Sequence, residues 1–181
     1  RAANEASAPA EDFYLGLFGT LDGIDWPAGF RCTAIDTETG ELAVWDEGSG
    51  VPLAHAVASS CAIPMLFPTV TVKGRSYMDG GLLSHLNTAA APLTDILVVL
   101  SCHPLGAKGA GGGGALAASV TPDAELAPLR TTRRLVAVEP DFSEIGAAVN
   151  MMDPNVTIQA FQIGNRQAAS AAAAMEVVWN C

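Results

Sequence analysis

The residues of this sequence that could do chemistry centre on Asp79, which follows the run SYM and directly precedes Gly80 and Gly81. The run is typical of a strand, and the two glycines give a turn where another segment can approach the backbone closely. This spacing places a carboxylate at the mouth of a strand, where it could have a functional role. Because an aspartate before two glycines is also a common turn residue, the surrounding sequence has to distinguish the two roles.

The segment Ala54–Asn87 sets Asp79 in a longer pattern, in which SSCAIPMLFP is followed by a short hairpin and by YMDGGLLS. This pattern resembles the second half of a patatin-like lipid acyl hydrolase. The resemblance implies that Asp79 corresponds to the catalytic aspartate, the sole base partner of a serine in a GxSxG elbow. Gly80 and Gly81 would then belong to the DG[GA] signature. The similarity runs from about Trp26 to Ser101, with a weaker one in MMDPNVTIQAFQIGNRQA.

A serine nucleophile is missing from this pattern, since no GxSxG occurs in the 181 residues. The family places that motif and its glycine-rich oxyanion segment before the part matched here. We therefore expect residues 1–181 to be the C-terminal portion of a single patatin-like domain that contains only the aspartate of a Ser-Asp dyad. The full-length protein would be a lipid acyl ester hydrolase, a phospholipase or lysophospholipase, and these residues alone would be inactive. The alternative is a non-catalytic relative that binds lipid or a protein partner.

Several other side chains are candidates for the site. The residues between the segment SSCAI and the hairpin are either core or lining of an acyl pocket, and the sequence leaves both open: Pro64, Met65, Leu66 and Phe67. Ser59, Ser60 and Cys61 lie at the end of a predicted helix without an elbow, which favours packing over nucleophilic attack. His55 is expected to be structural, whereas His85 could lie at the rim of the site.

Two further sequence patterns are weaker candidates for a functional site. Cys102 and His103 are neighbours at a strand end, where side chains alternate between faces, so they are not expected to form a thiol and base pair. The glycine-rich stretch at residues 104–115 lacks the Lys-Ser/Thr ending of a phosphate-binding loop and is expected to be a flexible surface loop. Serine-dependent acyl transfer needs no cofactor, and three scattered histidines give no support for a metal site.

Composition narrows the class of partner. Nine Lys and Arg against nineteen Asp and Glu give a formal charge of −10, which opposes nucleic acid and anionic bilayers. An acyl lipid would therefore be held by apolar contacts, with transient contact at a membrane surface allowed. Four dispersed cysteines favour a reducing compartment, so the expected location is cytoplasmic or peripheral at a membrane, with a targeting signal before Arg1 left open.

The elements that must position Asp79 are expected as follows. Residues 1–12 are predicted to be a tail or linker. Turn residues predict two hairpins, one joining Phe30–Asp36 to Glu41–Trp45 and one joining Thr69–Val72 to Arg75–Met78. A helix over Ser49–Ser60 is predicted with Pro52 in its first turn.

Beyond that region, Ile96–Leu100 and Leu135–Val138 are predicted as strands covered on both faces, and Ala115–Arg130 as partly helical. A long helix is predicted to start at Asp153 and Pro154 and to continue toward Trp179. Strands alternating with helices predict an α/β layered sandwich. The resemblance implies a mixed, largely parallel central sheet flanked by helices.

Overall fold

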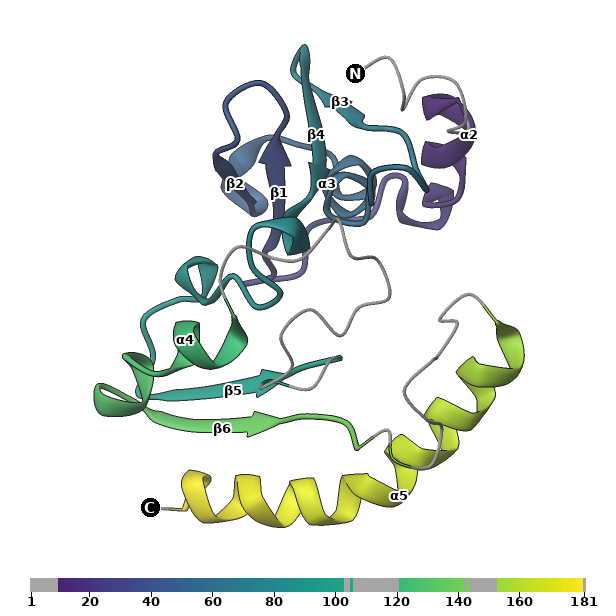
Figure 1. Ribbon diagram of the computed structural model, residues 1–181. Coiled ribbons are helices and arrows are strands. Elements are labelled where there is room, and N and C mark those ends of the chain that lie inside the picture. The colour runs from purple at the N-terminus through teal and green to yellow at the C-terminus, as the bar shows by residue number, and fades with distance from the viewer. Residues whose placement is uncertain (1–9, 103–104, 106–120, 142, 144–152, 181) are drawn as a thin grey trace. The chain divides into compact units, whose positions relative to one another are not determined.

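The computed structural model describes residues 10–102, 105, 121–141, 143 and 153–180. The chain divides into two compact units, Arg1–Pro92 and Leu93–Cys181, and Asp79 lies in the first (Figure 1). The expectation of one patatin-like domain across residues 1–181 stays a prediction.

The first unit is built on a four-stranded sheet in the order β2-β1-β4-β3 (Figure 1). Its strands are β1 (Cys32–Asp36), β2 (Leu42–Trp45), β3 (Val70–Val72) and β4 (Arg75–Asp79). Both predicted hairpins are confirmed, and the second turns at Lys73 and Gly74 with φ values of 50° and 78°. A two-residue hairpin loop needs such positive φ angles. Strand β1 also pairs with β4, with Ala34 opposite Asp79.

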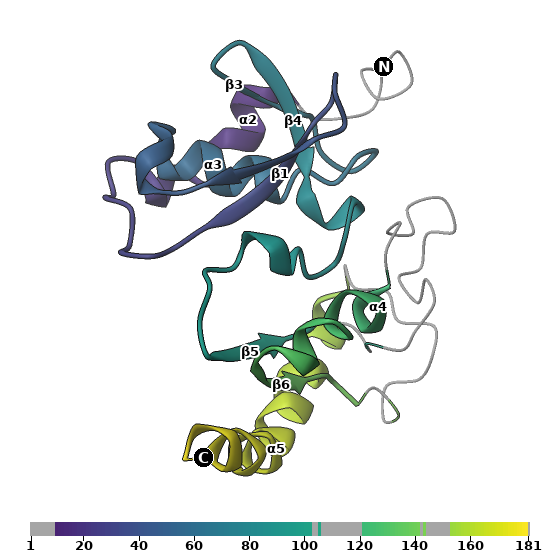
Figure 2. The same cartoon turned by 90° about the vertical axis from the view of Figure 1, so that its left-hand side faces the viewer.

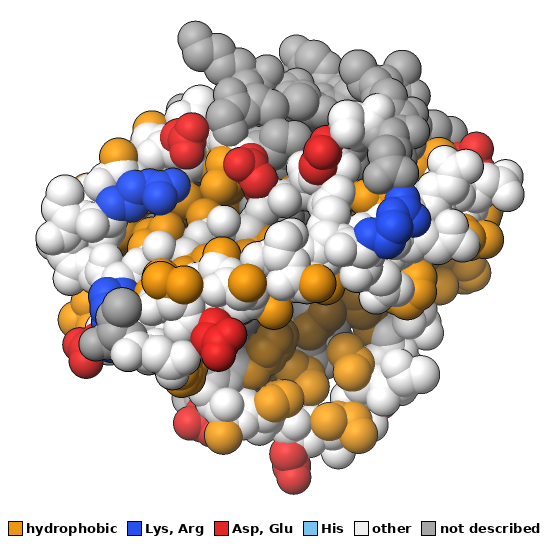
Figure 3. Space-filling view, turned by 90° about the horizontal axis from the view of Figure 1, so that it is seen from below, with side chains coloured by type: hydrophobic (Ala, Val, Ile, Leu, Met, Phe, Trp, Pro, Cys, Tyr) orange, Lys and Arg blue, Asp and Glu red, His pale blue; other side chains and the backbone are white. Residues whose placement is uncertain are grey.

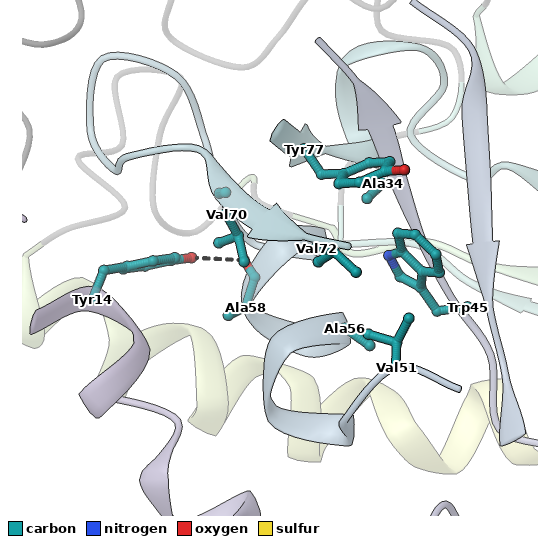
Figure 4. Close-up of a cluster of buried hydrophobic side chains, with 10 residues drawn as sticks. Tyr14, Ala34, Trp45, Val51, Ala56, Ala58, Val70, Val72 and Tyr77 are labelled. Atoms are coloured by element: carbon teal, nitrogen blue, oxygen red, sulfur yellow. Dashed lines mark hydrogen bonds between the residues drawn. The ribbon is translucent and has the colours of Figure 1, made fainter. Parts of the chain in front are cut away.

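Helix α3 (Leu53–Ser60) packs against this sheet and supplies small side chains to its core (Figure 2). Trp45 and Tyr77 meet edge to face with ring centroids 4.9 Å apart, and Val70 and Val72 pack beside them (Figure 4). An aromatic pair of this kind contributes about 1 kcal/mol beyond its buried area. The core therefore holds β4, and with it Asp79, in a fixed place.

Helix α2 (Glu11–Gly16) closes the other end of the core through Tyr14. The Tyr14 hydroxyl donates a hydrogen bond to the carbonyl oxygen of Ala58 at 3.0 Å (Figure 4). The Tyr14 ring also stacks on Phe67. Glu11 belongs to this helix, so the segment expected to be a tail or linker is helical from that residue. Residues 1–9 of that segment lie outside the described part of the chain.

Helix α3 begins later than predicted. Residues Glu47–Ser49 form the short 3₁₀ helix η2, and Gly50 then turns left-handed with φ of 62°. Pro52 precedes the helix as its N-cap with ψ of 139° and is not in the first turn. A proline disfavours helical geometry in the residue before it, so the helix cannot extend back through Val51. The end of the helix at Ser60 is confirmed.

The second unit contains the parallel pair β5 (Ile96–Leu100) and β6 (Arg134–Val138) together with helix α5 (Pro154–Trp179). The predicted helix start is confirmed, because Asp153 accepts a hydrogen bond from the backbone N–H of Asn155 at 2.9 Å. Helix α4 (Pro122–Leu126) and the 3₁₀ helix η5 (Leu129–Thr131) confirm that the described part of residues 115–130 is partly helical. Residues 106–115 of the glycine-rich stretch lie outside the described ranges.

Strand β5 and helix α5 of the second unit expose more apolar side chains to solvent than the sequence predicts. In β5 only Val99 is buried and Leu100 is 69% exposed, so the strand does not show the expected burial on both faces. Helix α5 also exposes large apolar side chains, among them Phe161 and Trp179. Figure 3, seen from the side on which α5 lies in Figure 1, shows hydrophobic side chains spread among a few charged ones. Across the described ranges no helix is both long and apolar enough to span a membrane.

The α/β class is confirmed, but the expectation of a largely parallel central sheet is wrong. The four-stranded sheet is antiparallel at each of its three pairings, and only β5 and β6 are parallel. The reason lies in the connections: two-residue and short turns can join only antiparallel neighbours, whereas a parallel pair needs a longer crossover.

Candidate active site

Asp79 is the last residue of strand β4 and lies at the edge of the first unit's core. Its backbone N–H donates to the carbonyl oxygen of Ala62 at 3.0 Å, just after α3, while β1 pairs alongside. Because side chains alternate along a strand, Arg75, Tyr77 and Asp79 share one face of β4. The aspartate is thus held between the end of a helix and the neighbouring strand.

The Asp79 carboxylate is half-buried and caps the short 3₁₀ helix η3 (Gly80–Leu82). Its Oδ1 accepts a hydrogen bond from the backbone N–H of Gly81 at 2.7 Å. Burial raises the pKa of Asp79 above its ordinary value, while the Gly81 hydrogen bond and the nearby charge of His85 oppose that rise. An oriented carboxylate with a raised pKa suits a general base.

Gly80 is buried because strand β1 occupies the space where a side chain would stand. A Cβ built there would come within 2.7 Å of the backbone oxygen of Thr33 and closer still to the Thr33 hydroxyl. The φ angle of Gly80 is not among the positive ones, so left-handed backbone strain would not oppose a side chain at this position. The glycine is required by close packing against β1.

Asn87 is a part of this site that sequence reasoning missed. Its Nδ2 atom donates to the carbonyl oxygens of Gly80 at 2.9 Å and Ser84 at 2.8 Å, and lies 3.4 Å from the hydroxyl of Thr33. Its backbone is left-handed, with φ of 48°, directly before the 3₁₀ helix η4 (Thr88–Ala90). A left-handed conformation is commoner for Asn than for most residues, and this preference was the available signal.

Two thiols and a phenol near this site have raised pKa values. Burial, followed by the charge of Asp79, raises the pKa of Cys61, and burial together with Cys61 raises the pKa of Cys32 to about 12. The pKa of the Tyr14 hydroxyl is also raised, first by burial and then by Cys61 and Asp79. Raised pKa values keep these thiols and this phenol in their neutral forms at pH 7.

The four candidates for pocket lining divide into two environments. Phe67 packs against the core and stacks on Tyr14 with ring centroids 4.9 Å apart. Pro64 is half-buried, whereas Met65 and Leu66 are 71% and 50% exposed. The backbone N–H of Asp79 donates to the carbonyl oxygen of Ala62, two residues before Pro64, so this segment starts close to Asp79. Its role as an acyl pocket stays a prediction.

The remaining candidates are not assembled with Asp79 into a second chemical site. Ser59 is fully buried, where its hydroxyl accepts from the Trp45 indole at 3.0 Å and donates to Ala56, so its predicted packing role is confirmed. His55 lies on α3, and within the described ranges its buried Nδ1 atom lacks a hydrogen-bond partner. Cys102 is exposed and His103 lies outside those ranges. No group of three metal-binding side chains occurs among the described residues.

The first unit therefore combines an α/β core with an oriented, half-buried aspartate before two glycines, as expected of a hydrolase domain with an aspartate base. The model of the patatin-like phospholipase family matches residues 6–92, so this part of the chain is similar to that family. The match covers just under half of the chain, includes Asp79 and ends at Pro92, where the first unit ends. No curated protein matches the chain. At the level of the family, the match indicates a lipid acyl hydrolase.

Proposed function

We propose that this chain supplies the aspartate of a Ser-Asp dyad to a lipid acyl ester hydrolase. The observation that carries the proposal is the geometry of Asp79, a half-buried carboxylate oriented by the Gly81 N–H within the family-matched residues. The serine would come from a GxSxG elbow that is not among these 181 residues. Gly80 and Gly81 would form the signature turn that lets this elbow approach.

In the proposed reaction Asp79 accepts the proton of the serine hydroxyl as the serine oxygen attacks the ester carbonyl carbon. The tetrahedral intermediate collapses to an acyl-enzyme, and the alcohol leaves with the proton that Asp79 had taken. Water then attacks the carbonyl carbon of the acyl group while Asp79 accepts its proton. The serine oxygen leaves, takes that proton back from Asp79, and the fatty acid is released. A carboxylate whose pKa is raised by burial is a better proton acceptor than an ordinary surface aspartate.

The proposed substrates are phospholipids or lysophospholipids. Met65 and Leu66 present exposed apolar side chains on the segment that starts beside Asp79, and they would contact the acyl chain. The formal charge of −10 disfavours recognition through an anionic surface, so the contacts that hold the lipid would be apolar, with brief contact at a membrane. No metal ion is required for this chemistry.

The test is Asp79→Asn in the whole protein, which keeps the size and the Oδ1 acceptor but removes the base. Hydrolysis of a short-chain p-nitrophenyl ester and of lysophospholipid should fall by about 10²–10⁴-fold with little change in the melting temperature. Near-native activity in this variant would mean that Asp79 is only a turn residue. Lipid binding without any hydrolysis by the wild-type protein would favour the non-catalytic relative.

A further inference from the structure

Asn87 and Asp79 contact opposite ends of the same peptide unit, the one that joins Gly80 to Gly81. The carbonyl oxygen of this unit accepts from Asn87 Nδ2 at 2.9 Å, and its N–H donates to Asp79 Oδ1 at 2.7 Å. We infer that Asn87 is a positioning residue for the hydrolysis, which fixes the Asp79 carboxylate by clamping this peptide. The inference rests on the proposed function of Asp79 as the base.

The clamp works because a peptide unit is planar. The carbonyl and the N–H between Gly80 and Gly81 cannot rotate independently, so holding the oxygen also aims the N–H at the carboxylate. Glycine on both sides would otherwise leave this unit with more rotational freedom than any other pair of residues allows. A carbonyl that accepts a hydrogen bond also makes the N–H of its own unit a stronger donor. Asn87 therefore affects both the direction and the strength of the bond to Asp79.

The contacts of the Asn87 side chain require an amide nitrogen, which donates hydrogen bonds. Three acceptor oxygens face Nδ2, those of Gly80, Ser84 and Thr33, and this fixes which end of the side chain is the nitrogen. A carboxylate in its place would turn an acceptor toward these oxygens. The left-handed backbone, with φ of 48°, adds a second requirement that Asn meets more easily than bulkier residues.

The other face of the turn is closed by β1. Thr33 lies against Gly80 without room for a Cβ, and its hydroxyl is within 3.4 Å of Asn87 Nδ2. The peptide between Gly80 and Gly81 is thus held by β1 on one side and by Asn87 on the other. The loss of Asn87 would free the carbonyl while leaving the contact with β1 intact, so the effect should appear in catalysis more than in stability.

The experiment compares Asn87→Gly with wild type in the whole protein, using a p-nitrophenyl ester. Glycine keeps the left-handed backbone and removes only the amide. We expect kcat to fall by about tenfold or more, with KM changed less than about twofold, because orientation of the base acts on the transition state. The acid limb of the kcat profile should move to higher pH, since a weaker bond from the Gly81 N–H stabilises the carboxylate less.

The matched control is Lys73→Gly, which makes the same kind of change at a left-handed residue in the turn before β4, with φ of 50°. It should leave kcat and the pH profile as in wild type. Asn87→Asp is the second variant. Aspartate also tolerates the left-handed backbone, but it replaces the donating Nδ2 with an oxygen that accepts hydrogen bonds. It should lose at least as much kcat as Asn87→Gly.

The outcomes separate this inference from the proposed function. Wild-type kcat and an unmoved acid limb in Asn87→Gly or Asn87→Asp, with Asp79→Asn inactive, would overturn the positioning role alone. Activity retained in Asp79→Asn would overturn the proposed function itself. If Asn87→Gly does not fold, the kinetics of Asn87→Asp decide, and failure of both to fold would show that Asn87 is a structural residue and overturn the inference.

Discussion

At the scale of single residues, two aspartates close to β4 have opposite environments. Asp36 is 5% exposed, and burial alone would raise its pKa, but hydrogen bonds from the Glu38 N–H, from Arg75 at 2.6 Å and from the Thr39 N–H together lower it. Asp79 has the Gly81 N–H and the charge of His85, which do not outweigh burial, so its pKa is raised. The first carboxylate is an ion-pair partner of Arg75, whereas the second has a raised pKa that suits the proposed base.

This contrast predicts opposite pH dependences of stability. A pKa that is raised on folding gives stability that is present below the pKa of the unfolded chain and is lost as the pH rises through the folded value. Asparagine cannot ionise, so Asp79→Asn should gain stability relative to wild type as the pH rises from about 3 to 7. The lowered pKa of Asp36 gives the opposite sign, so Asp36→Asn should lose stability relative to wild type over the same range.

Denaturant unfolding of the wild type and the two variants at a series of pH values checks this prediction. The same trend in both variants would contradict it, because it would mean that both carboxylates respond to burial alone. The pH dependence of Asp79→Asn requires no enzymatic activity, so it tests the environment of Asp79 independently of the proposed reaction.

At the scale of elements, the site depends on the approach of β1 to the turn after β4. Gly80 lies against Thr33, and Ala34 pairs with Asp79 in the same ladder. The three hydrogen bonds of Asn87 join this turn to the segment before η4. The proposed base is therefore positioned by the packing of three segments. A change in any one of them should alter the position of the Asp79 carboxylate.

We predict that Gly80→Ala lowers the free energy of unfolding by about 1–3 kcal/mol, because its Cβ would overlap the backbone of Thr33. Hydrolysis by the whole protein should fall with it, since relief of the overlap moves the turn that carries Asp79. Gly16→Ala is the control, because a Cβ on Gly16 in α2 meets nothing within 4 Å. Thermal melts measure the stability of both variants, and ester assays measure their hydrolysis. Equal stability of the two would contradict the close packing of Gly80 against β1.

At the scale of the whole molecule, the family match and the first compact unit end together at Pro92. The proposed base, the glycine turn and Asn87 all lie before that residue. The second unit contributes a parallel strand pair and a 26-residue helix. The chemistry proposed for this chain is thus concentrated in its first 92 residues.

We predict that residues 1–181 alone do not hydrolyse esters, whereas the whole protein does. Loss of the nucleophilic serine costs about a millionfold in turnover in a serine hydrolase, and no GxSxG is present here. The measurement is turnover of p-nitrophenyl butyrate by the purified 181-residue chain and by the whole protein. Turnover by the shorter chain at ordinary enzyme rates, blocked by a serine-reactive phosphonate, would show that one of its own serines is the nucleophile.

The sequence by itself determined much of the local structure. The hairpin that turns at Lys73 and Gly74, the end of helix α3 at Ser60 and the cap at Asp153 each depend on neighbouring residues, and all three predictions are confirmed. The resemblance to patatin-like hydrolases also came from a continuous stretch of sequence. Such features can be predicted because the residues that decide them lie within a few positions of one another.

Only the tertiary structure decided how the site is held. The steric need for Gly80 comes from Thr33, and the clamp on its carbonyl comes from Asn87, which meets Thr33 across 54 positions of sequence. The antiparallel pairing of β1 with β4, which contradicts the expected largely parallel sheet, brings these residues together. The opposite pKa shifts of Asp36 and Asp79 likewise depend on burial and on partners that the fold assembles. These contacts join segments whose distance in space is set by packing and not by local sequence pattern.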